Sequence, residues 1–173
     1  MIRLFADTAS NLHVALNKKY KVNIIPLSYS VDGVDAEYDL EHDFDGKAFY
    51  DAMRNGAEMK TSMVNTSAFR EKFEDAIKTG DSVVYIGLSG GVSGTVRAAE
   101  IAAEELCEEY PEAKIAVIDS LGAGLGIGIH LLIPRHFPHA TICPSSSPLR
   151  RGFILSMVPI AAVAPEILPP FLR

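Results

Sequence analysis

A loop rich in glycine and hydroxyl side chains follows a β-branched segment and precedes a predicted helix. Its sequence, residues 87–95, reads Gly-Leu-Ser-Gly-Gly-Val-Ser-Gly-Thr. Glycines let a backbone approach a ligand closely, the first amides of a helix are unpaired, and the helix dipole favours negative charge there. The loop therefore predicts an anion-binding site to which serine and threonine hydroxyls add donors. The structural alternative is that Ser93 only caps the helix and the glycines only form a turn.

The same loop also contains Gly87-x-Ser89-x-Gly91, which matches the nucleophile elbow of α/β-hydrolases. A serine hydrolase would need an acid and a base downstream, in the order Ser, Asp, His. The candidates are Asp119 and one of His130, His136 and His139. An elbow serine lies directly at the turn into its helix, whereas residues 90–93 separate Ser89 from the predicted cap. The pattern favours anion binding and leaves a serine hydrolase or esterase as the alternative.

Other polar side chains lie where predicted strands end or helices begin. Lys60-Thr61-Ser62 precedes a good helix start at Asn65, and Asp7 and Asp119 each close a strand. These hydroxyls can be idle loop residues, and the aspartates can simply cap turns. Nucleotide motifs fail, because no Lys-Ser or Lys-Thr pair follows the glycines of residues 87–95 and the glycines of residues 122–128 alternate every second position. We expect no metal and no cofactor.

Strands and helices alternate along the first 129 residues. Strands are predicted at 2–6, 22–31, 82–88 and 114–118, and helices at 12–20, 44–53, 67–78, 95–110 and from 121 onward. The alternation predicts an α/β fold with a mostly parallel central sheet and helices on both faces. Such sheets bind ligands beyond the carboxyl ends of their strands. The loops expected there are 7–10, 60–66, 89–95 and 119–122.

The composition is that of a globular protein, with 48% hydrophobic and 22% charged side chains among 173 residues. A net charge of −6 repels phosphate backbones and anionic lipid, which argues against nucleic-acid binding. The two cysteines, Cys107 and Cys143, lack metal-ligand spacing and are too few for a disulfide-dense secreted domain, which favours a reducing compartment. The apolar run that ends at Asp7 is too short for a signal peptide. We expect a cytoplasmic protein.

The composition changes near residue 129. Residues 1–129 carry a net charge of −9 and two prolines, whereas residues 130–173 carry +3 and eight prolines. Prolines at that density interrupt helices and central strands, so we expect an atypical tail over 130–173. The tail is interpreted as a disordered or loosely packed extension, or as translation out of the original reading frame. Its apolar stretch 153–172 contains Glu166 and four prolines, so we expect no membrane span.

Six motifs lie in order along residues 1–129. They are Asp7-Thr8-Ala9-Ser10; Pro26-Leu27 with Asp32-Gly33 and Tyr38; Phe49-Tyr50; Lys60-Thr61-Ser62; Leu88-Ser89 with Ser93-Gly94-Thr95; and Asp119-Ser120 with Gly124 to Gly128. Together they resemble the DegV family of bacterial fatty-acid-binding proteins, over the amino-terminal domain of a larger two-domain protein. The first motif departs from the family pattern at Asn11 and Leu12, and Arg97 interrupts the small residues that usually follow Ser-Gly-Thr.

The resemblance implies that a long-chain fatty acid is the ligand and that its carboxylate is held by Thr61 and Ser93. Ser62, Ser89 and Gly94 are then contacts of second rank. In the family some members present the bound acid to a fatty-acid kinase, so the resemblance implies a carrier rather than an enzyme. The family's second domain has no counterpart here, so we expect weakened binding. A truncated gene product with a fold and no function is a third interpretation.

Overall fold

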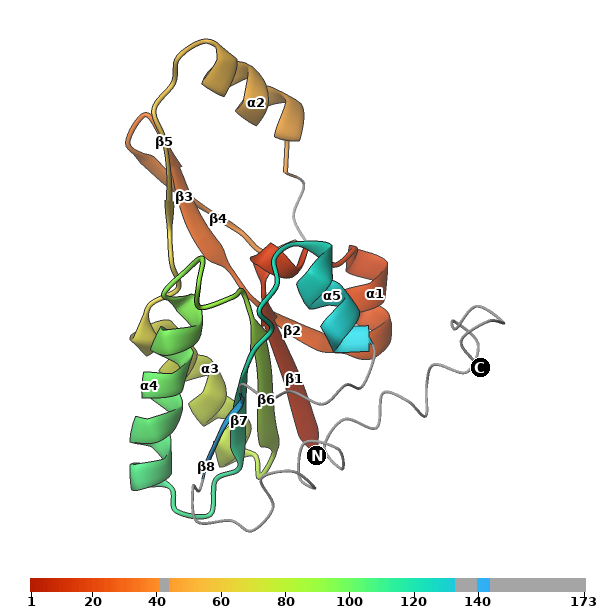
Figure 1. The fold of residues 1–173 in the computed structure, drawn as a ribbon, viewed down its shortest axis with the longest axis vertical. Coiled ribbons are helices and arrows are strands. Elements are labelled where there is room, and N and C mark those ends of the chain that lie inside the picture. Colours follow the sequence, from red (N-terminus) through yellow and green to blue (C-terminus); the bar gives the residue numbers. More distant parts are fainter. Residues whose placement is uncertain (41–43, 133–139, 144–173) are drawn as a thin grey trace, which may run out of the picture.

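The computed structural model describes residues 1–40, 44–132 and 140–143. Its main sheet contains β1 (Ile2–Asp7), β2 (Val22–Ile25), β6 (Ser82–Gly87), β7 (Ile115–Asp119) and β8 (Ala140–Cys143). The strand order is β2-β1-β6-β7-β8, with the first four strands parallel and β8 antiparallel to β7 (Figure 1). The expected mostly parallel α/β sheet is confirmed.

Helices cover both faces of this sheet because its strands are apolar on both sides. On β6, Tyr85 joins the core under α3 (Thr66–Lys78) and α4 (Thr95–Glu109). The next residue, Ile86, joins a second core with Leu12 and Ile127, under α1 (Val14–Tyr20) and α5 (Leu125–Leu132). This alternation follows the two-residue period of a strand. Gly128 of α5 lies close to the η1 turn (Thr8–Ser10), where an added Cβ would be 3.2 Å from the carbonyl oxygen of Ser10.

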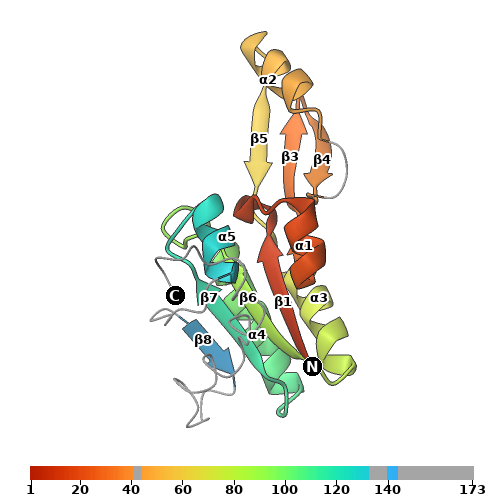
Figure 2. The ribbon, with the colours of Figure 1, turned by 90° about the vertical axis from the view of Figure 1, so that its right-hand side faces the viewer.

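A smaller antiparallel sheet extends beyond the carboxyl ends of the parallel strands (Figure 2). It consists of β3 (Leu27–Val31), β4 (Val34–Tyr38) and β5 (Met59–Ser62) in the order β4-β3-β5, with α2 (Gly46–Arg54) between β4 and β5 in the chain. The predicted turn at Asp32-Gly33 joins β3 to β4. The ring of Phe44 packs against those of Tyr29 and Phe49, at centroid distances of 6.0 and 5.4 Å.

Two expected elements differ from the structure. The single strand expected over 22–31 is divided at Pro26, which has no amide hydrogen for a sheet ladder, so β2 pairs with β1 and β3 begins the second sheet. The loop expected over 60–66 begins as strand β5, because Ser62 pairs with Ser28 at the edge of the small sheet. This segment therefore does not follow a parallel strand, although it lies beyond the same end of the main sheet.

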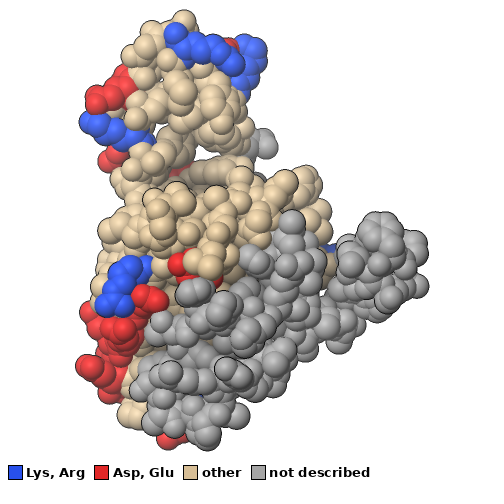
Figure 3. Space-filling view, viewed as in Figure 1, with Lys and Arg blue, Asp and Glu red and all other residues tan. Residues whose placement is uncertain are grey.

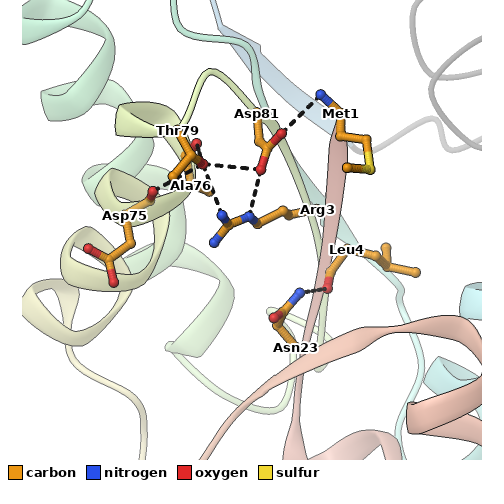
Figure 4. Close-up of polar contacts among 8 residues, drawn as sticks. All are labelled: Met1, Arg3, Leu4, Asn23, Asp75, Ala76, Thr79 and Asp81. Carbon is orange, nitrogen blue, oxygen red and sulfur yellow. Dashed lines mark hydrogen bonds and ion pairs between the residues drawn. The ribbon is translucent and has the colours of Figure 1, made fainter.

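The opposite end of the main sheet is held by ion pairs, as Figure 4 shows. Asp81 accepts a hydrogen bond from Nε of Arg3 at 2.8 Å and pairs with the amino group of Met1 at 2.9 Å. The Met1 ammonium and the Arg3 guanidinium lower the pKa of Asp81 to about 2. On the flank of the molecule, acidic side chains gather along α4 (Figure 3), and Arg70 of α3 pairs there with Glu105 and Glu109.

The boundary expected after residue 129 falls inside α5. Residues 140–143 of the expected tail form β8 at the edge of the main sheet. The apolar stretch 153–172 lies outside the described residues, and within them no helix is long and apolar enough to cross a membrane. Cys107 on α4 is disulfide-bonded, whereas its sequence context favoured a reducing compartment, where disulfides are rare.

Candidate functional site

The candidate site lies where the strand order of the main sheet reverses. The chain passes from β1 outward to β2 but later from β6 outward to β7, so the loops after β1 and β6 diverge from a shared position. Open α/β sheets bind ligands in the crevice formed at such a switch point. Around this position lie η1, residues 88–94 and, above them, the small sheet (Figure 2).

A pocket of about 520 Å³ occupies this position. Its lining residues come from the η1 turn, the small sheet with α2, and the loop after β6: Thr8, Ala9, Asn11, Leu27, Ser28, Tyr29, Tyr38, Phe44, Phe49, Thr61, Ser62, Met63, Leu88, Val92 and Ser93. Aromatic and aliphatic side chains dominate, with a few hydroxyl groups among them. This lining is typical of a site for an amphipathic ligand with one polar end.

The Lys60-Thr61-Ser62 motif enters the pocket from β5. Thr61 pairs with Tyr29 across the antiparallel ladder, whereas Ser62 pairs with Ser28. Since directly opposed residues share a face and successive residues alternate, Thr61 shares the face of Tyr29, and Ser62 belongs to the other face. Both residues line the pocket, at its exposed edge.

Ser93 lines the same pocket from the amino-terminal end of α4. Its Oγ lies 2.8 Å from Oγ1 of Thr95 and accepts a hydrogen bond from the Thr95 amide at 3.3 Å. The N-cap residue of α4 is Gly94, which has no side chain to cap the helix. Ser93, the expected cap, lies one residue earlier and accepts from the amide of Thr95, the first residue of the helix. An added Cβ at Gly94 would lie 2.8 Å from Sδ of Met63, the residue after β5, so the end of that side chain lies against the start of α4.

Ser89 and Gly94 are not among the residues that line the pocket. Ser89 is 9% exposed, and its Oγ accepts a hydrogen bond from the Gly91 amide. The carboxylate of Asp119 likewise accepts hydrogen bonds from backbone amides, from Gly90 at 3.1 Å and from Leu121 at 2.8 Å. This arrangement orders two loops and disfavours a catalytic triad. His136 and His139 lie outside the described residues, and so does the side chain of His130.

Asp7 accepts more hydrogen bonds than the turn cap expected from the sequence. Its Oδ1 accepts from the Ala9 amide at 3.0 Å, as a cap would, but its Oδ2 accepts from the Leu88 amide at 3.0 Å and from the hydroxyl of Tyr85 at 2.7 Å. Asp7 and Tyr85 are fully buried. Burial raises the pKa of the Asp7 carboxyl, and the hydrogen bonds from Leu88, Tyr85 and Ala9 oppose that shift. Burial also raises the pKa of Tyr85.

Sequence reasoning did not predict the aromatic wall formed by Tyr29 and Phe44, nor the apolar contribution of Met63 and Val92. The spacing of aromatic residues between 29 and 50 was an available signal. Among the described residues no group of acidic, histidine or cysteine side chains is arranged to hold a metal ion.

Comparison with known proteins points to one family. A family model described as an uncharacterised protein family, DegV, matches residues 1–133. A DegV domain-containing protein of Clostridium perfringens, CPE0026, is 36% identical over 126 residues, which cover 73% of this chain and 43% of that protein. The match thus covers less than half the length of this curated relative.

Two solved structures extend the similarity to the fold. A fatty-acid-binding DegV family protein of Thermus thermophilus superposes with a TM-score of 0.65 at 29% identity, over 74% of this chain and 44% of that one. A stearic acid-binding protein of Eubacterium ventriosum superposes with a TM-score of 0.67 at 26% identity, over 76% and 46% of the two chains.

Proposed function

Because this chain belongs to the DegV family, we propose that its pocket binds a long-chain fatty acid by the carboxylate. The observation that carries the proposal is the amphipathic lining, in which Thr61 and Ser93 reach one apolar pocket from two separate elements. Hydroxyl donors can bind a carboxylate, and the amino-terminal end of α4 beside Ser93 favours negative charge. Ser62 adds a hydroxyl at the rim, while Ser89 and Gly94 support the loop.

The acyl chain is the main source of affinity in this proposal. A buried methylene contributes about 0.8 kcal/mol, whereas a hydrogen bond to a charged group contributes about 1.5–3 kcal/mol. A long chain in contact with Tyr29, Phe44 and Phe49 therefore outweighs its head group, and the hydroxyls set the orientation. These sums are upper limits, because association itself costs several kcal/mol.

The role we propose is carriage rather than catalysis. The carboxylate end of the ligand would remain near the hydroxyls at the mouth of the pocket, where a fatty-acid kinase could phosphorylate it. The matched part of the chain covers 43–46% of each similar protein. We propose that this pocket binds an acyl chain less tightly than a pocket that encloses it fully. Exposed apolar side chains at the rim support this, since Met63 is 56% and Val92 71% exposed.

Native mass spectrometry of the purified chain tests the proposal. We expect an adduct of fatty-acid mass on the wild-type chain and its loss from the variant Thr61→Ala/Ser93→Ala. The matched control is Ser30→Ala/Ser67→Ala, which removes two hydroxyls that do not line the pocket and should retain the adduct. A wild-type chain that neither carries nor takes up fatty acid would contradict the proposal. Labelling by a fluorophosphonate that Ser89→Ala abolishes would favour the hydrolase instead.

A further inference from the structure

The buried carboxylate of Asp7 connects two loops that line the pocket. Asp7 ends β1 and accepts hydrogen bonds from the amides of Ala9 and Leu88, which belong to the loops after β1 and β6. Both Ala9 and Leu88 line the pocket. The carboxylate therefore lies directly beneath the switch point, between the two loops that diverge there.

Tyr85 orients this carboxylate from the side of the sheet that α3 and α4 cover. Its hydroxyl donates to Oδ2 of Asp7, and its ring packs against those of Phe69 and Phe73. Gly87 lies two residues further along β6, on the same face. An added Cβ at Gly87 would lie 2.6 Å from Cζ of Tyr85, so the absence of a side chain leaves the ring room to extend along the strand to Asp7.

Burying this carboxylate is unfavourable for stability. An ionised carboxylate loses its hydration in the interior, which is why the pKa of Asp7 is raised. Its ionisation therefore costs stability as the pH rises through that raised pKa. Removing a buried polar cluster in favour of apolar packing is often neutral or stabilising, so stability alone does not account for an aspartate at position 7.

We propose that Asp7 is a positioning residue of the fatty-acid site, and that Tyr85 orients it. The inference rests on the proposed function. Asp7 fixes Leu88, and the turn that follows is compact, because the amides of Val92 and Ser93 both donate to the carbonyl oxygen of Ser89. The position of Leu88 thus determines where the Ser93 hydroxyl lies. On the other side, Asp7 fixes Ala9 and with it the turn that carries Thr8.

The test compares two Tyr→Phe variants. Tyr85→Phe removes the hydroxyl that orients Asp7 and keeps the ring. Tyr110→Phe removes a hydroxyl that donates to Glu74 at 2.8 Å, at the end of α4 far from the pocket, and is the matched control. For each chain we would measure the palmitate dissociation constant by calorimetry, the melting temperature without ligand, and hydrogen exchange of the Leu88 amide by NMR.

We expect Tyr85→Phe to weaken palmitate binding about threefold to tenfold. This is less than the loss of a direct hydrogen bond to a charged ligand predicts, because Tyr85 acts on the site through Asp7. In Tyr85→Phe the Leu88 amide should exchange faster. Tyr110→Phe should change the melting temperature but neither the palmitate dissociation constant nor the exchange rate of the Leu88 amide. Asp7→Asn should weaken binding further, and Tyr85→Phe decides the matter if Asp7→Asn does not fold. Palmitate binding by Tyr85→Phe as tight as by the wild type, or an unchanged Leu88 amide, would overturn the proposal. A wild-type chain that binds no palmitate would instead contradict the proposed function.

Discussion

Gly87 illustrates how a residue without a side chain can determine the geometry of the site. Tyr85 and Gly87 share a face of β6, and the fully buried Tyr85 ring occupies the space where a Cβ of residue 87 would be. The ring has little freedom to move, because its hydroxyl is bonded to Asp7 and its faces pack against α3. A side chain at position 87 would therefore force the ring or the strand to shift.

We predict that Gly87→Ala lowers the free energy of unfolding by about 1–3 kcal/mol, which is the usual cost of overpacking a core. Urea denaturation followed by circular dichroism would measure it. Gly126→Ala is the matched control, because among the described residues no atom outside its own helix backbone and chain neighbours lies within 4 Å of its added Cβ, and alanine is favoured over glycine in a helix. Equal stability of the Gly87→Ala and wild-type chains would show that the Tyr85 ring is free to move.

Asp81 predicts a pH dependence at the other end of the sheet. Its pKa is lowered to about 2 from the usual value of 3.8, so its ionised form is the one that stabilises the fold. The contribution is complete above the unfolded-state pKa and is lost as the pH falls toward about 2. As the pH falls from the unfolded-state pKa toward about 2, the melting temperature should decrease more steeply for the wild-type chain than for Asp81→Asn.

The control for that experiment is Asp51→Asn on α2. Asp51 pairs with Lys47 and Arg54, but these cations are exposed, and exposed pairs contribute little. The Asp51→Asn chain should therefore follow the wild-type curve. If the Asp81→Asn chain also showed the wild-type dependence of melting temperature on pH, the ion pairs of Asp81 would contribute nothing measurable to stability.

At the scale of elements, the hydroxyl of Thr8 links the two sheets. Oγ1 of Thr8 accepts a hydrogen bond from the Leu27 amide at 3.1 Å, where the chain leaves β2 at Pro26 and enters β3. Thr8 is buried and lines the pocket. The hydrogen bond thus connects η1 of the main sheet with the first residue of the small sheet.

We predict that Thr8→Val, which keeps the shape of the side chain, lowers the free energy of unfolding by about 1–3 kcal/mol, because it leaves the Leu27 amide without its acceptor. It should also weaken fatty-acid binding, since the small sheet carries Thr61. Thr79→Val is the control, because Thr79 accepts from Arg3 at the opposite end of the sheet and should affect only stability. Palmitate calorimetry and urea denaturation would separate these effects. Unchanged binding in Thr8→Val would show that this junction does not position the site.

The elements that could be predicted are those with a strong local pattern. In α3, Phe69 and Phe73 recur at helical spacing, and Asn65 caps the first turn by accepting from the Ala68 amide at 2.8 Å. Strand β5 lacks such a pattern, since Met59–Ser62 is polar and short, and it is a strand because it pairs with β3. Pairing between segments about thirty residues apart leaves no local signal.

The candidate site, too, contains residues that the sequence could predict and residues that it could not. The glycine- and hydroxyl-rich loop that carries Ser93 is visible in the sequence because such a loop before a helix suggests anion binding. Thr61 is singled out as a carboxylate ligand only by the resemblance to the DegV family. The partnership of Asp7 with Tyr85 is not visible in the sequence, because 78 residues separate them and an aspartate after a strand has the ordinary explanation of a turn cap. Only the sheet order brings β1 beside β6 and these two side chains together.

At the scale of the whole molecule, the matched part of the chain covers 43–46% of the length of its similar proteins. Its pocket is walled by η1, the small sheet and the loop after β6, and Met63 and Val92 remain exposed at the rim. An acyl chain in this pocket would keep part of its surface in water. Affinity should therefore rise with chain length more slowly than for a fully enclosed ligand.

We predict that each added methylene tightens binding by less than about fourfold, the factor that corresponds to about 0.8 kcal/mol for full burial. Calorimetric titration with saturated acids from octanoate to palmitate would measure the increment. Matching alcohols are the control for the head group and should show a similar increment at lower affinity. Affinity independent of chain length would contradict an acyl-binding pocket.

The most direct measurement is carbon-13 NMR of palmitate labelled at its carboxyl carbon, with the wild-type chain and the variant Thr61→Ala/Ser93→Ala. We predict a bound carboxyl resonance, distinct from that of free palmitate, in the wild type and its loss or return toward the free position in the variant. The same bound resonance in both chains would contradict a carboxylate held by Thr61 and Ser93. No bound resonance in the wild type would contradict fatty-acid binding itself.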